Sequence, residues 1–258
     1  MTLKPLLNVE KLSKYYGKIK ACDQISFNLY PAQVLGIVGE SGSGKSTLLN
    51  AIGRYIPIDK GNITYTTSNG EILTVPKLSE TSCRLLRRTE WGFVQQNPRD
   101  GLRMNVTAGA NIGERLMDIG VKNYGKIRKE AAYWLNQVEI DINRIDDLPK
   151  MFSGGMQQRL QLARVLVTKP RLILMDEPTG GLDVSVQARL LDLIRSLVRN
   201  LQLSVILVTH DLGVVRLLAH RLLVMKNGQI VESGLTDQVL DDPQHSYTQQ
   251  LVSSTLIP

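Results

Sequence analysis

The sequence of 258 residues has only two cysteines and no long run of apolar residues. Cys22 and Cys83 lie outside any Cys-x-x-Cys or Cys/His cluster, so the pattern indicates neither a metal site nor a disulfide, and we expect two reduced thiols. Apolar stretches such as residues 203–208 are interrupted well before the roughly 18 residues that a membrane-spanning helix needs. The N-terminal residues show no sustained apolar segment and no small-residue cleavage site, so we expect no secretory signal and a cytoplasmic location.

The overall composition excludes several classes of protein without selecting one. Hydrophobic residues make up 43% of the chain and charged residues 21%, which is typical of a globular protein rather than a disordered, collagenous or coiled-coil one. At about 150 residues per domain, the length predicts one to two domains. The formal net charge of +7 comes from scattered basic residues, with one cluster at Arg84, Arg87 and Arg88, so charge alone does not predict an anionic partner.

Hydrophobic periodicity predicts a chain that mixes strands and helices. Residues 24–29 alternate between polar and apolar, and a second such segment covers residues 61–65, as in half-buried strands. Between them, the short apolar strand predicted at residues 33–38 runs into a glycine-rich stretch and then into a helical pattern. Residues 103–166 show apolar residues at helical spacing, which predicts a helical insert.

The second half of the chain predicts parallel strands followed by a hairpin. Strands predicted at residues 171–175 and 203–208 flank an amphipathic helix at residues 186–199, the alternation of a parallel βαβ unit. Strands at residues 221–225 and 229–232 then flank Asn227-Gly228, a step that favours a tight turn. The tail after Gly234 is predicted to hold a helix and a loop.

Residues 39–46, GESGSGKS, match the P-loop pattern of Gly, four residues, Gly, Lys and Ser. Glycines let such a loop wrap a phosphate, so that backbone N–H groups and the N-terminus of the next helix point at the anion. Lys45 would reach the β and γ phosphates, Ser46 would bind Mg²⁺ and Thr47 would touch the α phosphate. A flexible Gly/Ser turn is the disfavoured alternative. The predicted nucleotide-binding residues of this loop are Gly39, Ser41, Gly42, Gly44, Lys45, Ser46 and Thr47.

Residues 172–177, LILMDE, predict a buried strand that ends in two carboxylates. Asp176 would bind the metal ion, and Glu177 would orient or deprotonate the attacking water as a general base. Alone, such a run is more often a strand entering a polar turn. Together with an upstream P-loop, the catalytic interpretation is favoured.

The segment FSGGMQQR, residues 152–159, resembles the signature motif of ATP-binding cassette (ABC) ATPases. Further segments resemble other motifs of that family in the family's order. They are Tyr16-Gly17, which resembles the aromatic loop that stacks on adenine, VQQNP around Gln96, which resembles the Q-loop, GGLD at residues 180–183, which resembles the D-loop, and LVTHD, in which His210 resembles the switch histidine.

The resemblance implies an ATPase that uses ATP and Mg²⁺ and works as a dimer. It implies that Gln96 senses the metal ion and the attacking water, that His210 contacts the γ phosphate, and that both act with Glu177 in catalysis. The implied Mg²⁺ ligands are Ser46, Gln96 and Asp176. Ser153, Gly154 and Gly155 would face the ATP of the other protomer, and Tyr16 and Asp183 are also predicted to contact nucleotide. The sequence departs from the commonest motifs at Phe152 (usually Leu), Met156 (usually Gln) and Gly180 (usually Ser).

The fold class implied is α/β, a P-loop NTPase with an antiparallel β subdomain and an inserted α-helical subdomain. We expect a single ABC ATPase domain over residues 1–258. Its parts would be a RecA-like core with an N-terminal β subdomain at 1–97 and 167–240, a helical subdomain with the signature motif at 98–166, and a C-terminal tail at 241–258.

The partner-specific segments narrow the branch of the family. The ending DDPQHSYTQQL resembles the tail shared by oligopeptide, nickel and phosphonate-linked ATPases, with Ser246 where Pro is usual. Several longer segments closely resemble the ABC subunits of the bacterial carbon–phosphorus lyase system, which breaks down phosphonates. This resemblance implies docking on the soluble lyase core subunits, a homodimer or a heterodimer with a second ABC subunit, no direct membrane insertion and no nucleic acid. The alternatives are an ATPase subunit of a membrane importer for peptides, nickel or phosphonate, and a nucleic-acid-associated ABC ATPase.

Overall fold

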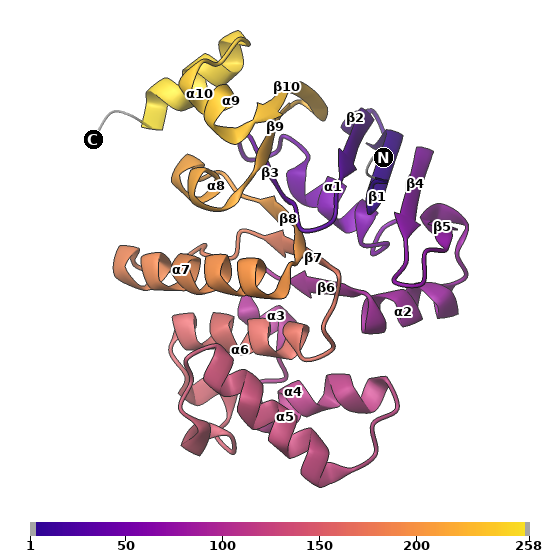
Figure 1. Cartoon of the computed structure of the whole chain (residues 1–258). Helices are drawn as coiled ribbons and strands as arrows, with labels where there is room; N and C mark the ends of the chain where they lie inside the picture. Colours follow the sequence, from indigo (N-terminus) through magenta and orange to yellow (C-terminus); the bar gives the residue numbers. More distant parts are fainter. Residues whose placement is uncertain (1–3, 256–258) are drawn as a thin grey trace. The chain divides into compact units, whose positions relative to one another are not determined.

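The computed structural model describes residues 4–255 and divides into two compact units (Figure 1). The first unit combines the chain up to Cys83 with the chain from Leu197, and the second is Arg84–Ser196. Two helices span the boundaries between them, α2 (Glu80–Thr89) and α7 (Val184–Leu201). The subdomain limits expected at residues 98 and 166 fall inside the second unit and stay a prediction.

The first unit contains an antiparallel sheet in the order β2-β1-β4-β5. Leu7 pairs with Leu29 on one side and with Tyr65 on the other, which places β1 between β2 and β4. Bulges interrupt the register of β1 on both sides, and Lys11 has a φ of 47°. The strands are β1 (Leu7–Tyr16), β2 (Ile19–Leu29), β4 (Lys60–Thr66) and β5 (Ile72–Thr74), followed by the short 3₁₀ turn η1 (Val75–Lys77).

A second set of strands in the first unit surrounds β3 (Val34–Val38). This strand pairs in parallel with β8 (Ser204–Val208) and β9 (Arg221–Lys226), and every residue of β3 and β8 is buried, as expected for strands covered on both faces. β9 forms a hairpin with β10 (Gln229–Leu235) through Asn227 and Gly228, whose φ values are 48° and 78°. Left-handed conformations at both positions are those of a type I′ turn, so the predicted hairpin is confirmed.

Helices complete the first unit. α1 follows β3, α8 follows β8, and the tail contains two helices where the sequence predicted one helix and a loop. Their bounds are α1 (Lys45–Ile52), α8 (Leu212–Leu218), α9 (Thr236–Asp241) and α10 (Ser246–Thr255).

The second unit packs helices beside the parallel strand pair β6 (Trp91–Val94) and β7 (Leu172–Asp176). The expected helical insert is confirmed, and its core contains the buried side chains of Ile112, Trp134 and Leu160. Its elements are α3 (Pro98–Gly101), α4 (Ala108–Asp118), α5 (Tyr124–Gln137), η2 (Ile142–Arg144), η3 (Pro149–Met151) and α6 (Gly154–Leu166). Among residues 4–255, none of the helices has the length and apolar character needed to span a membrane.

Candidate functional site

The loop between β3 and α1 follows a path that only glycine permits at several positions. A Cβ atom on Gly39 would lie 2.2 Å from the carbonyl oxygen of Met225, and one on Gly44 would lie 2.0 Å from the carbonyl oxygen of Ala21. Gly42 has a φ of 81°, and a Cβ there would meet nothing within 4 Å. Gly39 and Gly44 therefore allow close packing, whereas Gly42 supplies a conformation on an open side of the loop.

The start of α1 is suited to an anion. Gly44 precedes the helix in a left-handed conformation without a side-chain cap, and the first turn contains no acidic residue. Lys45 is 8% exposed, and its Nζ donates hydrogen bonds to the carbonyl oxygens of Gly39 (2.7 Å) and Glu40 (2.8 Å). The ammonium group is thereby folded back over the loop, beside a helix N-terminus that favours negative charge.

His210 lies at the same sheet edge as this loop. β8 runs parallel to β3, Ile37 pairs with Val208, and the N–H of Thr209 donates to the carbonyl oxygen of Ile37 at 3.1 Å. Asp211 then caps α8 through its carboxylate, which accepts the N–H of Gly213 at 2.8 Å. The hydrogen bonds of Thr209 and Asp211 fix the backbone on both sides of His210, and the side chain of His210 is exposed.

Tyr16 ends β1 with a half-exposed ring. The Nζ of Lys14 lies 5.5 Å from the ring centroid, and Asp59 binds both that ammonium group (3.3 Å) and the N–H of Tyr15 (2.6 Å). The hydrogen bond from Tyr15, with a smaller effect of Lys14, lowers the pKa of Asp59. The carboxylate thus fixes the strand end that presents the ring, and an exposed aromatic ring is a suitable stacking surface for a base.

In the second unit, Gln96 and Glu177 come together. They follow the parallel strands β6 and β7, which pair Val94 with Met175. Glu177 has a φ of 43°, and its carbonyl oxygen accepts the N–H of Gly180 at 2.9 Å. A Cβ on Gly180 would lie 3.3 Å from that oxygen and 3.7 Å from the Cγ of Gln96. Glu177 is one of nine non-glycine residues with a positive φ in the described part of the chain, so this conformation by itself does not mark a functional site.

The backbone of the Q-loop is held by two glutamines of α6 that the sequence analysis did not single out. Gln161 Oε1 accepts the N–H of Gln95 at 2.6 Å, and its Nε2 donates to the carbonyl oxygen of Gln95 at 3.2 Å and to Gln158 Oε1 at 2.9 Å. Gln158 Nε2 donates to the carbonyl oxygen of Gln96 at 2.9 Å. We call Gln158 and Gln161 the glutamine clamp. Both are 1% exposed, and polar residues on the buried face of a helix are the signal that could have revealed them.

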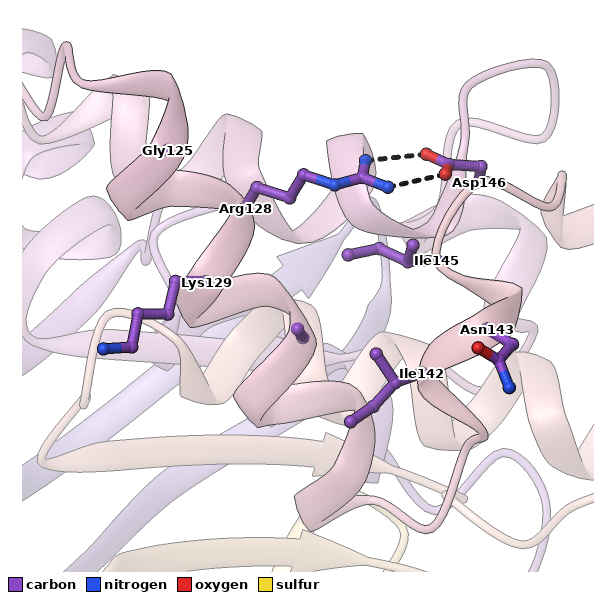
Figure 2. A pocket seen from close by; sticks show the side chains of 8 residues that line it. Gly125, Arg128, Lys129, Ile142, Asn143, Ile145 and Asp146 are labelled. Atoms are coloured by element: carbon purple, nitrogen blue, oxygen red, sulfur yellow. Dashed lines mark hydrogen bonds and ion pairs between the residues drawn. The ribbon is translucent and has the colours of Figure 1, made fainter.

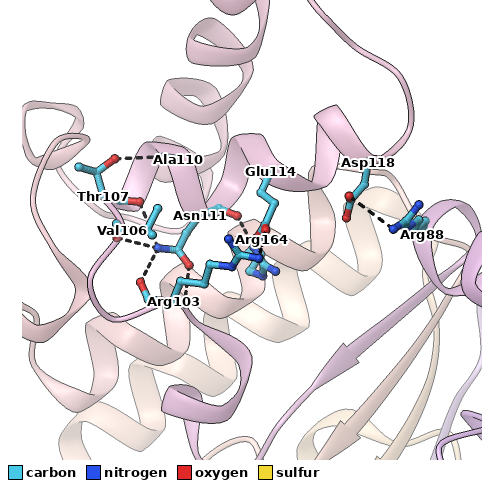
Figure 3. A network of polar contacts seen from close by, with 9 residues as sticks. All are labelled: Arg88, Arg103, Val106, Thr107, Ala110, Asn111, Glu114, Asp118 and Arg164. Atoms are coloured by element: carbon cyan, nitrogen blue, oxygen red, sulfur yellow. Dashed lines mark hydrogen bonds and ion pairs between the residues drawn. The ribbon is translucent and has the colours of Figure 1, made fainter.

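A polar network fixes the segment that leaves the Q-loop (Figure 3). The fully buried Asn111 accepts the N–H of Arg103 at 2.8 Å and donates to the carbonyl oxygens of Arg103, Val106 and Thr107. Glu114 binds Arg103 at 2.7 Å and Arg164 of α6 at 2.8 Å. The loop after α3 is therefore bound directly to α4, and α4 is in turn bound to α6 through Arg164.

The signature motif forms the start of α6. The hydroxyl of Ser153 caps the helix by accepting the N–H of Met156 at 3.4 Å, and a Cβ on Gly155 would lie 2.4 Å from Val186 Cγ1. Gln157 Nε2 donates to the carbonyl oxygens of Pro149 and Phe152, both at 3.0 Å, which fixes the preceding loop. The helix has no acidic residue in its first turn, so its N-terminus also suits an anion.

The two departures within the signature motif share one partner. The Arg144 guanidinium lies 4.5 Å from the ring centroid of Phe152, and its Nη1 lies 3.5 Å from the Sδ of Met156. Asp147 accepts a hydrogen bond from Arg144 Nε at 2.7 Å and orients the group. Phe152 and Met156 thus belong to one packed cluster at the signature loop.

Asp183 caps α7. Its carboxylate accepts the N–H of Val186 at 3.0 Å and the hydroxyl of Ser185 at 2.8 Å, and these hydrogen bonds, with that of Val186 the stronger, lower its pKa. An ionised aspartate at a helix N-terminus is a stabilising cap. The predicted contact of Asp183 with nucleotide stays a prediction.

The donor set predicted for Mg²⁺ is chemically suitable. Ser46, Gln96 and Asp176 offer hydroxyl, amide and carboxylate oxygens, which are hard ligands of the kind Mg²⁺ prefers. In residues 4–255 there is no group of three or more His, Cys, Asp or Glu side chains that could hold a metal ion.

An open pocket of about 440 Å³ lies between α5 and η2 (Figure 2). Arg128 and Asp146 form a bidentate ion pair at this pocket, with Nη1–Oδ1 and Nη2–Oδ2 distances of 2.8 and 2.6 Å. The two charges therefore neutralise each other. Its lining contains none of the predicted site residues, and we assign it no ligand.

A glycine-rich loop with a folded-back lysine at a helix N-terminus, together with carboxylates at a strand end, defines a P-loop nucleotide-binding protein. A model of the ABC transporter family matches residues 22–180. The chain belongs to this family and is an ATPase of the ABC class, and its predicted α/β fold is confirmed.

Individual relatives are similar over most of the chain. It is 62% identical to the putative phosphonates utilization ATP-binding protein PhnK of Escherichia coli (strain K12), over 98% of both chains. It is 39% identical to the oligopeptide transport ATP-binding protein OppD of Bacillus subtilis (strain 168), over 96% of this chain and 71% of that one. The structure is similar to the dimeric, post-hydrolysis state of the ATP-binding cassette MJ0796 bound to ADP and Pi, with a TM-score of 0.78, 29% identity, and coverage of 89% of this chain and 98% of that one.

Proposed function

We propose that this ABC ATPase docks on the soluble core of a carbon–phosphorus lyase and drives its conformational cycle in phosphonate breakdown. The observation that carries the proposal is the 62% identity, over nearly the whole of both chains, to a protein named for phosphonate utilization. The similarity to a peptide transport subunit is much lower, at 39%, and covers 71% of that protein.

The P-loop would bind the phosphates of ATP. Lys45 would exchange its hydrogen bonds to loop carbonyls for contacts with the β and γ phosphates, and the N–H groups from Ser41 to Thr47 would surround the anion. Tyr16 would stack on the adenine through its half-exposed ring. These contacts do not require a partner protein.

Hydrolysis would depend on residues at the strand ends. Glu177 would orient or deprotonate the attacking water, Gln96 would sense Mg²⁺ and that water, and His210 would contact the γ phosphate. Mg²⁺ would be held by Ser46, Gln96 and Asp176 and would neutralise charge that develops on the phosphates. The hydrogen bond from the N–H of Gly180 to the carbonyl oxygen of Glu177 holds the backbone of this residue just after β7, which supports a defined position for the base.

Dimerisation would couple ATP to movement. Ser153, Gly154 and Gly155 would bind the γ phosphate of the other protomer's ATP at the N-terminus of α6, so ATP would stabilise a closed dimer. Loss of the γ phosphate would weaken the dimer and reopen it. The dimeric state of the similar cassette bound to ADP and Pi supports this arrangement.

The second candidate is the ATPase subunit of a membrane importer for peptides, nickel or phosphonate. Its support is the 39% identity to an oligopeptide transport subunit. It shares the whole ATP cycle with the first candidate, so experiments on the nucleotide site do not distinguish the two.

Purification with native partners separates them. The tagged chain and a tagged Lys45→Ala control are isolated from cells grown on a phosphonate, with and without added ATP, and bound proteins are identified by mass spectrometry. We expect soluble lyase subunits to be isolated with the wild-type chain. Added ATP should change the amount of bound subunits less with the variant, because the variant lacks the Lys45 contact with the phosphates. Co-isolation of integral membrane subunits instead would overturn the lyase assignment in favour of the importer.

A further inference from the structure

The C-terminal tail is anchored to the sheet by a carboxylate of β10. Glu232 Oε1 accepts the N–H of Gln244 at 2.8 Å, and Oε2 accepts the N–H of His245 at 3.0 Å. His245 Nδ1 in turn accepts the N–H of Tyr247 at 3.1 Å. These hydrogen bonds hold the start of α10 against β10.

Tyr247 connects this anchored tail to the P-loop. Its side chain is 2% exposed, and Lys226 Nζ lies 4.4 Å from the centre of its ring. The hydroxyl accepts the N–H of Glu40 at 3.0 Å, a contact across 207 positions of the sequence. Burial raises the pKa of Tyr247, so the hydroxyl keeps its proton at neutral pH.

Glu40 is a junction within the loop. Its carbonyl oxygen accepts Lys45 Nζ at 2.8 Å and the N–H of Ser43 at 3.1 Å, while its N–H is held by the tail. The hairpin turn adds a second contact, because the N–H of Gly228 donates to the carbonyl oxygen of Ser43 at 3.0 Å. The C-terminal part of the chain therefore binds the loop at two points, the N–H of Glu40 and the carbonyl oxygen of Ser43.

We propose that Tyr247 is a positioning residue that fixes the conformation of the P-loop through the N–H of Glu40, so that the folded tail sets the affinity for ATP. A loop already held in its binding conformation loses less freedom when it closes on phosphate, and it binds more tightly for that reason. The inference rests on the proposed role of residues 39–46 in phosphate binding. It does not depend on which partner the ATPase serves.

The direct test is Tyr247→Phe, which removes the hydroxyl and keeps the ring beneath Lys226. Calorimetric titration with ATP is expected to show a dissociation constant about two- to tenfold higher, the factor that one net hydrogen bond carries. The hydrolysis rate at saturating ATP should change less than twofold, because the hydroxyl does not contact the reacting atoms. Tyr133→Phe, the same change at a half-exposed tyrosine of α5, is the matched control and should bind ATP like the wild type.

A second variant tests whether the tail acts through Tyr247. Glu232→Gln turns one acceptor of the anchor into a donor that faces an N–H group, so it should also raise the dissociation constant. In the double variant the two effects should not multiply, because both act through the same contact. Wild-type affinity in either single variant, or effects that multiply, would overturn the proposal, and Glu232→Gln provides this test even if Tyr247→Phe does not fold. Absence of ATP binding by the wild-type chain would instead overturn the P-loop assignment.

Discussion

Replacing Gln161 with leucine tests whether α6 holds the Q-loop through the glutamine clamp. Leucine has a similar size and a comparable helix propensity, so the change removes polar atoms with little effect on helix stability or packing. Three hydrogen bonds are lost: those to the N–H and the carbonyl of Gln95, at 2.6 and 3.2 Å, and that to Gln158 Oε1, at 2.9 Å. The Q-loop then keeps only the contact of Gln158 within the clamp.

The expected cost follows from the groups left without partners. A buried donor or acceptor that loses its partner costs about 1–3 kcal/mol. Gln158 Oε1 is buried, whereas the groups of Gln95 are partly buried and are reached by water at a lower cost. We therefore expect the free energy of unfolding to fall by about 2–3 kcal/mol, a substantial part of the 5–15 kcal/mol typical of a domain.

Urea denaturation measures this loss, and hydrogen exchange locates it. The amide of Gln95, which donates to Gln161 Oε1, should exchange roughly tenfold faster or more, because about 1.4 kcal/mol corresponds to a factor of ten. Gln250→Leu, at an exposed position of α10, is the control, since a surface substitution usually changes stability by less than about 0.5 kcal/mol. Equal unfolding free energies and equal exchange in the two variants would refute the role of the clamp.

The remaining predictions concern Glu177, the proposed catalytic base, and the Cys22 thiol. Glu177→Gln should bind ATP with unchanged affinity, lose most hydrolysis and accumulate a closed dimer, as measured by phosphate release and size-exclusion chromatography. Unchanged turnover would exclude Glu177 as the base. Burial raises the pKa of the Cys22 thiol to about 12, so in the folded protein at pH 8 it should resist alkylation until urea unfolds the chain. Rapid labelling of Cys22 in the native state, detected by mass spectrometry, would contradict its burial.

Local signals made the P-loop and the hairpin predictable. Residues 39–46 match the P-loop spacing, and two of its glycines are required by the backbone. A Cβ added at Gly39 or Gly44 would overlap a neighbouring carbonyl oxygen. Asn227-Gly228 adopts the positive φ values that its composition favours. In both cases the residue type and the conformation are linked within a few positions of the chain.

β1 was not predicted because its pattern is broken. Bulges near Val9, Leu12 and Lys14 shift the register, so buried residues do not alternate strictly with exposed ones. Period-2 reasoning fails wherever an extra residue enters a strand. The same limit does not apply to β2, in which Ile25, Phe27 and Leu29 keep the alternation that predicted it.

The supports of the candidate site were not predictable because their partners lie far apart in sequence. Gln161 and Gln95 are separated by 66 positions, and Tyr247 and Glu40 by 207. A glutamine in an amphipathic helix or a tyrosine in a tail has many possible partners, and only the fold selects one. The residues that would contact nucleotide have local signatures, whereas the contacts of the residues that hold them in place do not.

The departures from the family's motifs have a physical explanation in two of three cases. Phe152 and Met156 both pack against Arg144, whose guanidinium contacts a ring face and a sulfur atom in one cluster. A leucine at 152 would lose the cation–π contact, so the signature motif here is one unit with Arg144 and Asp147 rather than a list of independent positions. At Gly180 a Cβ would lie 3.3 Å from the Glu177 carbonyl oxygen, a tight contact, and the structure gives no further reason for glycine there. The signature motif is therefore adapted to its own neighbours, and transferring the commoner residue to Phe152 or Met156 alone would disturb the packing that both share with Arg144.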